Sequence, residues 1–197
     1  MIEILKNPKT ENYRLLKETI LSRRFPWFYA STTTHGESEG IPGFVNVPMF
    51  GHVFIGRPET YGWSATDSDM HQLAVNVVRE ILHENNFISK QYFILRLAAN
   101  CVLPNDGLQY SEPHIDHTFP HFNFIVYLTN SGGNTIVEED THEPIEDQPI
   151  IFTGWHYMQL PKKERRIVLV ATIFPLDEEN LNSLGIPYLN PSYTGPF

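Results

Sequence analysis

Apolar residues recur at helical spacing in two segments of the N-terminal half. The first segment covers residues 10–22, where Thr10 is placed to cap the helix. The second covers residues 67–85, with Asp67 or Asp69 as its cap. The apolar stripes are Tyr13, Leu15, Leu16 and Ile20 in the first segment, and Met70, Leu73, Ala74, Val77 and Ile81 in the second.

The pattern changes to short β-strands after residue 90. Turn-forming residues such as Ser131-Gly132-Gly133-Asn134 separate the apolar runs. Between Ser31 and Thr66 the chain is rich in Gly, Pro, Ser and Thr, which favours a functional loop or lid. The predicted strands are Gln91–Leu103, Ser111–His117, Phe122–Asn130, Thr135–Glu138, Gln148–Thr153 and Arg166–Phe174.

Helices followed by six or more closely spaced strands predict a mainly β protein, a sandwich or jelly roll buttressed by helices. The length of 197 residues fits a single domain. Within it we expect N-terminal helices and a substrate loop over 1–89, a β core over 90–175 and a tail over 176–197.

Composition narrows the function classes. With 14 Lys and Arg against 23 Asp and Glu, the net charge is −9, and the only basic cluster is Lys162, Lys163, Arg165 and Arg166. A nucleic-acid partner is therefore disfavoured. The lone Cys101 excludes an internal disulfide, and we see neither a signal peptide nor an apolar run of membrane-spanning length. These features predict a cytoplasmic protein with no membrane partner.

The candidate chemistry lies between residues 114 and 174. His114 and Asp116 share one face if they lie on a strand, and His156 follows a strongly apolar strand. Two His and one carboxylate form the facial triad of non-haem Fe(II) oxygenases, which leaves positions open for other ligands. Ten residues after His156 comes Arg166, and a guanidinium there suits the far carboxylate of a 2-oxo acid.

These motifs resemble the Fe(II)/2-oxoglutarate-dependent dioxygenase superfamily, especially its prolyl-hydroxylase-like branch and small phage-encoded oxygenases. The resemblance covers residues 90–175 and rests on PHID, FIVYLTN, GGNTIVE, PIIFTGWH and RRIVLVATIF in that order. It implies a double-stranded β-helix, and a hydroxylase in the cytoplasm (the host cytoplasm for a phage protein). Its cofactors would be Fe(II), 2-oxoglutarate and O2. The implied substrate is a peptide side chain or a small molecule.

The resemblance also implies residue roles. His114, Asp116 and His156 would bind Fe(II). Arg166 would bind the C5 carboxylate of 2-oxoglutarate, with its neighbour Arg165 as the rival, and Tyr127 would meet the same carboxylate. Val168 stands where several subfamilies carry Ser, which places more weight on Tyr127 or Thr135. Arg96 and Tyr92 are weaker candidates for contact with co-substrate or substrate.

Two other function classes stay open: a cupin-like metal enzyme that does not use 2-oxoglutarate, and a non-catalytic jelly-roll binding protein. A zinc site of His114, His117 and His121 is disfavoured, and the last two are expected in solvent or at the cavity mouth. His35, His52, His71, His83 and His142 are expected to be structural or at the surface. Five aromatic residues either pack in the core or contact the substrate: Trp27, Phe28, Tyr29, Trp63 and Trp155.

Overall fold

The strand β12 (Arg166–Pro175) lies at the centre of the largest sheet. It pairs antiparallel with β5 (Tyr92–Val102) on one side and with β7 (Phe122–Tyr127) on the other. The computed structural model describes residues 1–32, 43–87, 91–105 and 109–176. The remaining strands of this sheet are β1 (Glu3–Ile4), β2 (Phe28–Ala30), β4 (Met49–Ile55) and β10 (Pro149–Phe152).

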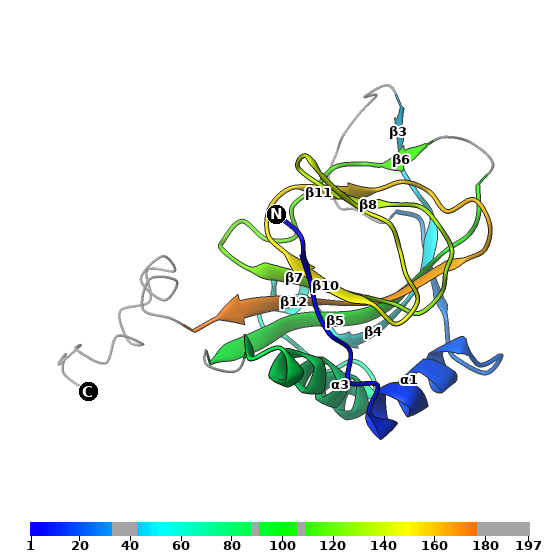
Figure 1. The fold of residues 1–197 in the computed structure, drawn as a ribbon. Coiled ribbons are helices and arrows are strands. Elements are labelled where there is room, and N and C mark those ends of the chain that lie inside the picture. Colours follow the sequence, from blue (N-terminus) through cyan, green and yellow to red (C-terminus); the bar gives the residue numbers. More distant parts are fainter. Residues whose placement is uncertain (33–42, 88–90, 106–108, 177–197) are drawn as a thin grey trace.

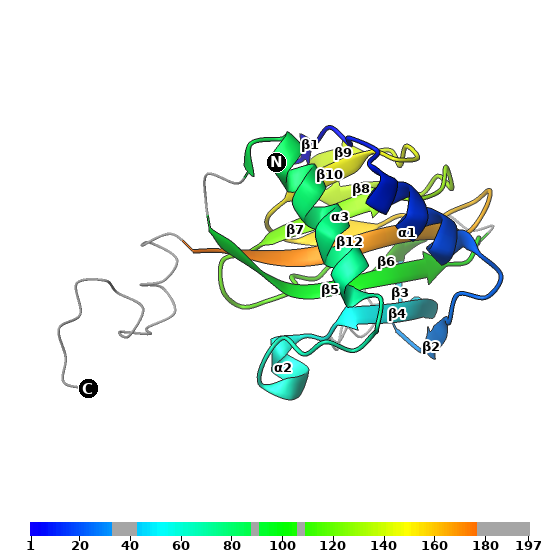
Figure 2. The ribbon, with the colours of Figure 1, turned by 90° about the horizontal axis from the view of Figure 1, so that it is seen from below.

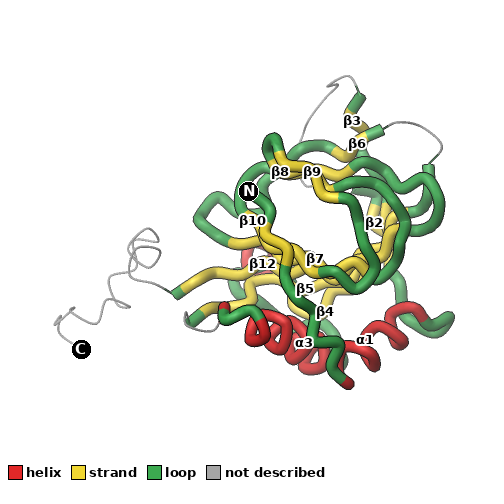
Figure 3. Tube along the Cα trace, viewed as in Figure 1, coloured by secondary structure: helices red, strands yellow, loops and turns green. Residues whose placement is uncertain are grey.

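The seven strands run in the order β1-β10-β7-β12-β5-β4-β2, and every neighbouring pair is antiparallel. A smaller sheet, in the order β11-β8-β9, lies opposite this large sheet (Figures 1 and 3). A short parallel pair, β3 with β6, adds to that side. The bounds of these strands are β3 (Phe44–Val45), β6 (Tyr110–Ser111), β8 (Thr135–Val137), β9 (Asp140–His142) and β11 (His156–Met158). The predicted mainly β, jelly-roll architecture is confirmed.

The helices cover the outer face of the large sheet (Figure 2). α1 (Glu11–Leu21) and α3 (His71–Glu84) pack on each other and share one apolar core with that face. The short α2 (Pro58–Tyr61) follows β4. Burial of this core removes large apolar side chains such as Leu16, Phe54 and Ile81 from water, which stabilises the layer arrangement.

Strand alternation along β12 divides its side chains between the two faces. One set packs against the helices and the other faces the interior between the sheets. The helix-facing residues are Ile167, Leu169, Ala171 and Ile173, and the interior residues are Arg166, Val168, Val170 and Thr172. Both faces of this strand are buried, which explains its nearly unbroken apolar sequence.

The predicted Gly-Gly turn leads into β8. Gly133 has φ of 78°, and a Cβ there would collide with the carbonyl oxygen of Gln159. Glycine is therefore required both for the backbone conformation and for the close approach of the backbone of residues 159–161.

The structure corrects several details of the predicted elements. Leu15 is exposed, and the second helix begins at His71 without Asp67 or Asp69 as cap. The expected loop of residues 31–66 contains β4, a strand inside the large sheet. His35, residues 33–42 of that loop and residues 177–197 of the expected tail lie outside the described residues.

The expected division at residue 90 stays a prediction, although the large sheet takes strands from both sides of it. No helix among the described parts of the chain is long and apolar enough to cross a bilayer.

A half-buried polar cluster fixes α1 to the turn before β10. Asp147 accepts hydrogen bonds from the Tyr13 hydroxyl at 2.7 Å and the Lys17 ammonium at 2.5 Å, and Lys9 lies 2.9 Å from its second oxygen. Burial alone would raise the pKa of Asp147, but these donors outweigh burial and lower the pKa to about 2. The carboxylate therefore stabilises the fold in its ionised form.

Asp147→Asn should lower the free energy of unfolding at pH 7 by about 2 kcal/mol, because a charged acceptor is lost. Asparagine also tolerates the positive φ of 67° at this position. An unfolded Asp titrates near pH 3.9, so the stabilisation is complete above that pH and falls as pH drops toward 2. Urea unfolding at pH 7 and pH 3 should show the difference shrinking to roughly half. The exposed Asp69→Asn is the control, and an unchanged difference at pH 3 would contradict this explanation.

Candidate metal centre and its cavity

Two backbone hydrogen bonds hold His114 opposite His156. The His114 N–H donates to the His156 carbonyl at 3.0 Å, and the His156 N–H donates to the His114 carbonyl at 2.9 Å. His156 begins β11, whereas His114 forms only this isolated bridge, so the predicted continuous strand 111–117 is wrong. The bridge nevertheless places the two imidazole centroids 4.3 Å apart.

The hydrogen bonds of the two rings select their tautomers. Nδ1 of His114 lies 3.2 Å from the Glu112 carbonyl oxygen, and Nδ1 of His156 lies 3.2 Å from the Gly154 carbonyl oxygen. A carbonyl only accepts, so each Nδ1 carries the proton and each Nε2 lone pair is available as a ligand. Burial lowers the pKa of His114, and it lowers that of His156 to about 4, so both rings are neutral at pH 7.

Asp116 brings the negative charge. Its Oδ2 lies 3.5 Å from Nε2 of His156, while its Oδ1 pairs with Arg57 and lies 3.6 Å from Nη1 of Arg96. Arg57 also donates to the backbone carbonyl of Asp116 at 2.9 Å. Burial would raise the pKa of Asp116, but the two guanidinium groups hold it well below its usual range. Oδ2 is therefore an ionised donor that faces the histidines.

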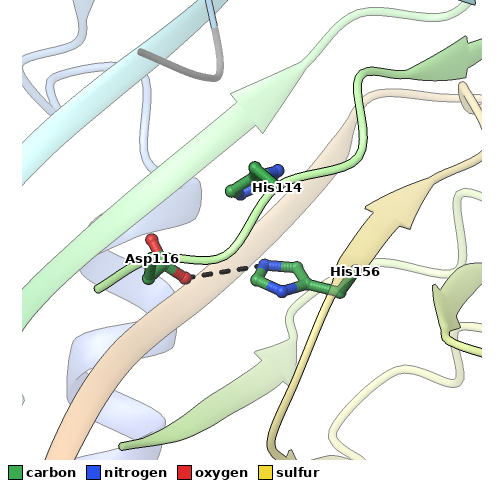
Figure 4. Close-up of side chains that lie close together, drawn as sticks. All are labelled: His114, Asp116 and His156. Atoms are coloured by element: carbon green, nitrogen blue, oxygen red, sulfur yellow. Dashed lines mark ion pairs between the residues drawn. The ribbon is translucent and has the colours of Figure 1, made fainter. Parts of the chain in front are cut away.

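The candidate ligand atoms of His114, Asp116 and His156 all lie within 4.8 Å of one another, and Figure 4 shows the side chains converging. Two neutral imidazoles and one carboxylate form the donor set preferred by non-haem Fe(II). The structure thus brings together the three residues that the sequence singled out, and this group could hold a metal ion.

A strap from residues 57–61 supports the segment that carries Asp116. Arg57 holds Asp116, and two residues later Glu59 pairs with Nδ1 of His117. Nε2 of His117 lies 2.8 Å from the hydroxyl of Thr172 on β12. His117 is therefore buried, as is His121, and the expectation that they lie in solvent or at a cavity mouth is wrong. The sequence around Arg57 signals only a helix start before Pro58, so nothing in it pointed to this role.

Arg166 lies in the same cavity as the three candidate ligands. Its Nη2 donates to the Thr135 hydroxyl at 2.9 Å, and its Nε is buried without a hydrogen-bond partner. Burial lowers the pKa of this guanidinium, and no carboxylate of the described residues pairs with it. Arg165, the residue before β12, is exposed. The buried guanidinium without a carboxylate partner is therefore that of Arg166.

Tyr127 lies beside this guanidinium and also contacts Thr135. The Tyr127 hydroxyl lies 2.7 Å from the Thr135 hydroxyl, and the Arg166 Cζ lies 5.3 Å from the Tyr127 ring centre. Burial raises the pKa of Tyr127 although Arg166 opposes the shift. Tyr127 is fully buried and does not line the cavity, whereas Thr135 does.

Side chains from β4, β5, β7 and β12 form one wall of this cavity. Arg96 and Val168 line it, but Tyr92 does not. None of the five aromatic residues considered for substrate contact lines this cavity, although Phe28 and Tyr29 line a neighbouring groove. His52 and His142 lie on strands and are buried, so they pack inside the fold.

No protein-family model and no curated protein matches this sequence. Solved structures do match its fold. An oxidoreductase of the 2OG-Fe(II) oxygenase family from Burkholderia pseudomallei is similar with a TM-score of 0.63 and 14% identity, over 88% of this chain and 85% of that chain. A prolyl hydroxylase from Trichoplax adhaerens, in complex with a hypoxia-inducible-factor peptide, gives 0.55 and 11% over 91% and 84%.

SnoN, a non-haem alpha-ketoglutarate-dependent epimerase from nogalamycin biosynthesis, gives a TM-score of 0.53 and 12% identity over 88% of this chain and 78% of that chain. At these identities the likeness concerns the fold. The chain therefore has the fold of 2OG-Fe(II) oxygenases, including a prolyl hydroxylase, and the expected resemblance is confirmed at that level.

Asp116→Asn should abolish tight binding of Mn(II) by the metal-free protein, since the anionic donor is lost. It should also lower the free energy of unfolding by about 3 kcal/mol, because Arg57 then lacks its buried carboxylate. Calorimetric metal titration and urea unfolding measure the two effects separately. The exposed His83→Asn is the control for both. Tight Mn(II) binding that survives in Asp116→Asn would contradict this assignment.

Proposed function

We propose that the protein is an Fe(II)- and 2-oxoglutarate-dependent dioxygenase that hydroxylates a peptide side chain or a small molecule. The alternatives considered above share parts of the site but not all of it. A cupin-like metal enzyme needs the three ligands, and a binding module needs neither these ligands nor a buried unpaired arginine.

One observation carries the proposal: the His-Asp-His group lines the same cavity as Arg166, whose buried guanidinium has no carboxylate partner among the described residues. A buried guanidinium without a carboxylate is costly in a protein interior. An anionic ligand would supply the missing partner. Because a planar guanidinium binds a carboxylate through two parallel hydrogen bonds, a dicarboxylate that also reaches the metal fits this arrangement.

In this proposal His114, Asp116 and His156 hold Fe(II), and Arg166 holds the C5 carboxylate of 2-oxoglutarate. Iron with 2-oxoglutarate and O2 supplies the oxidation: the C–H bond becomes C–OH while 2-oxoglutarate yields succinate and CO2. Thr135 orients Arg166, and Tyr127 in turn fixes Thr135. Arg57 keeps one oxygen of Asp116 occupied, so the other oxygen faces the metal position.

The decisive test is an anaerobic titration of the metal-free protein with Fe(II) and then 2-oxoglutarate. The visible charge-transfer band of the chelate should appear only when both are present. Arg166→Gln should weaken the 2-oxoglutarate dependence of the band by about 100-fold, because two charged hydrogen bonds are lost. Arg165→Gln, which removes the adjacent exposed guanidinium, should change it by less than about twofold. Bound metal without any band would exclude this function and favour the cupin-like alternative.

Thr135 and Tyr127 should differ in their effects on the same titration. Thr135→Val removes the acceptor of Arg166 and should weaken 2-oxoglutarate binding about tenfold. Tyr127→Phe leaves the contact between Thr135 and Arg166 intact, so a loss of less than about threefold is expected. An effect of Tyr127→Phe as large as that of Arg166→Gln would mean instead that the phenol contacts the co-substrate directly.

A further inference from the structure

Arg96, in the middle of β5, is a second unsatisfied guanidinium of the cavity. Its side chain is 15% exposed, and its ion-pair contact with Asp116 spans 3.6 Å, beyond ordinary hydrogen-bond length. Within the described part of the chain it makes no hydrogen bond. Its donors therefore face the space that it lines.

Asp116 does not satisfy Arg96 because Arg57 holds that carboxylate more closely. Arg57 contacts both Oδ1 and the backbone carbonyl of Asp116. The charges around the cavity consequently do not balance. Of the charged side chains that line the cavity, Arg96 and Arg166 are positive and Asp116 is negative, and Asp116 is already paired with Arg57. Fe(II) and 2-oxoglutarate carry opposite charges of equal size, so their binding leaves this excess unchanged.

The strand register shows that Arg96 and Arg166 lie too far apart to bind the same carboxylate. Arg96 is the partner of Thr172 on β12, six residues beyond Arg166. At about 3.3 Å per residue, their positions along the sheet differ by roughly 20 Å. The C5 carboxylate that Arg166 would hold is therefore out of reach of Arg96. A different anionic group is needed at the end of the cavity where Arg96 and Asp116 lie.

A second donor lies in the same row of the sheet. Thr172 is the register partner of Asn123 on β7 as well as of Arg96. The Nδ2 of Asn123 is buried without a hydrogen-bond partner, and Asn123 also lines the cavity. An unpaired amide and an unpaired guanidinium in one row favour a ligand group with several acceptor oxygens.

A groove along β4 and β5 shares part of its lining with the cavity. Met49, Arg96 and Asn100 line both spaces. The groove crosses the small residues Gly51 and Ala98 and reaches Phe28, a residue that is 65% exposed on the edge strand β2. Its acidic residue, Asp67, is exposed and forms no ion pair with Arg96 among the described contacts. This surface suits an apolar group attached to the anion.

We propose that Arg96 binds a carboxylate of the substrate, and that the apolar part of the same molecule lies along the groove toward Phe28. The proposal rests on the function proposed above and adds the substrate class: an acid with an apolar body. The carboxylate could belong to a small free acid or to the end of a peptide. Both sources present the same chemistry to Arg96.

The test uses the full chain loaded anaerobically with Fe(II) and 2-oxoglutarate. The probes are the N-acetyl derivatives of the apolar amino acids, each as the free acid and as the primary amide. Tetrapeptides that end in the same residues form a second arm. Calorimetry measures binding without turnover, while the charge-transfer band reports the metal and co-substrate independently.

At least one acid should bind the wild-type protein about 10- to 100-fold more tightly than its amide. Arg96→Gln should remove this preference and keep the band. Arg96→Lys, which preserves the charge beside Asp116 but not the planar fork, should retain the band and an intermediate preference. The exposed Arg79→Gln on α3 is the matched control and should bind like the wild type. Tighter binding of tetrapeptides than of short acids would identify a peptide end as the source.

Three results would overturn the inference. In the first, no acid binds the wild type, or acids and amides bind equally. In the second, Arg96→Gln keeps the preference for acids. In the third, Arg96→Gln weakens 2-oxoglutarate rather than the acids, which would assign Arg96 to the co-substrate. Absence of the band in the wild-type protein would instead reject the proposed function itself, so the two failures are distinguishable.

Discussion

The antiparallel register of β12 with β5 and β7 is the constraint on which the site depends. Ten consecutive residues of β12 pair with β5, and this pairing determines which side chains share a row on the interior face. Arg166, Thr172 and Arg96 owe their relative positions to it. Because the side-chain period of a strand is two, a slip of one residue would turn Arg166 toward the helices and bury its charge in the apolar core.

The same sheet accommodates a buried charge excess that the protein does not neutralise by itself. A core that evolved only for stability would place a carboxylate beside each guanidinium or avoid both. Here the carboxylate of Asp116 is held by Arg57 and also faces two histidines, and no ion pair among the described residues involves Arg166. Stability is thus exchanged for an interior prepared for ligands. The destabilisation by the buried charges is offset by the apolar core on the opposite face of the large sheet, where the sheet packs against α1 and α3.

The sequence was sufficient where the determinants are local. The long strands β5 and β12 follow from apolar runs, and α1 follows from its apolar stripe and the Thr10 cap. The turn before β8 follows from its two adjacent glycines, which adopt positive φ easily. His114, Asp116, His156 and Arg166 were recognisable because their spacing brackets apolar strands. Such patterns consist of residue types at regular spacing, and both can be recognised in the sequence alone.

The sequence was insufficient where the determinants are contacts between distant segments. Arg57 lies 59 residues from Asp116, in a segment whose Gly and Pro content favoured a loop, so no periodicity connects the two. The burial of His117 likewise depends on Glu59 and on Thr172, each more than 50 residues away. The strand β4 does not follow from the sequence because it lies in a segment rich in Gly and Pro and is interrupted by Gly51, yet it supplies the floor of the groove beside Arg96.

These long-range contacts also reconcile an acidic protein with an arginine-rich cavity. A net charge of −9 repels small anions at a distance, but at physiological ionic strength charges are screened beyond about 8 Å. Long-range attraction therefore contributes little, and an anion is recognised only after it enters the cavity, where water is scarce and guanidinium donors are already placed. Selectivity in such a site arises from contact geometry. The strap of Arg57 and Glu59, which fixes Asp116 and leaves Arg96 unsatisfied, is accordingly as important to recognition as the metal ligands are to the chemistry.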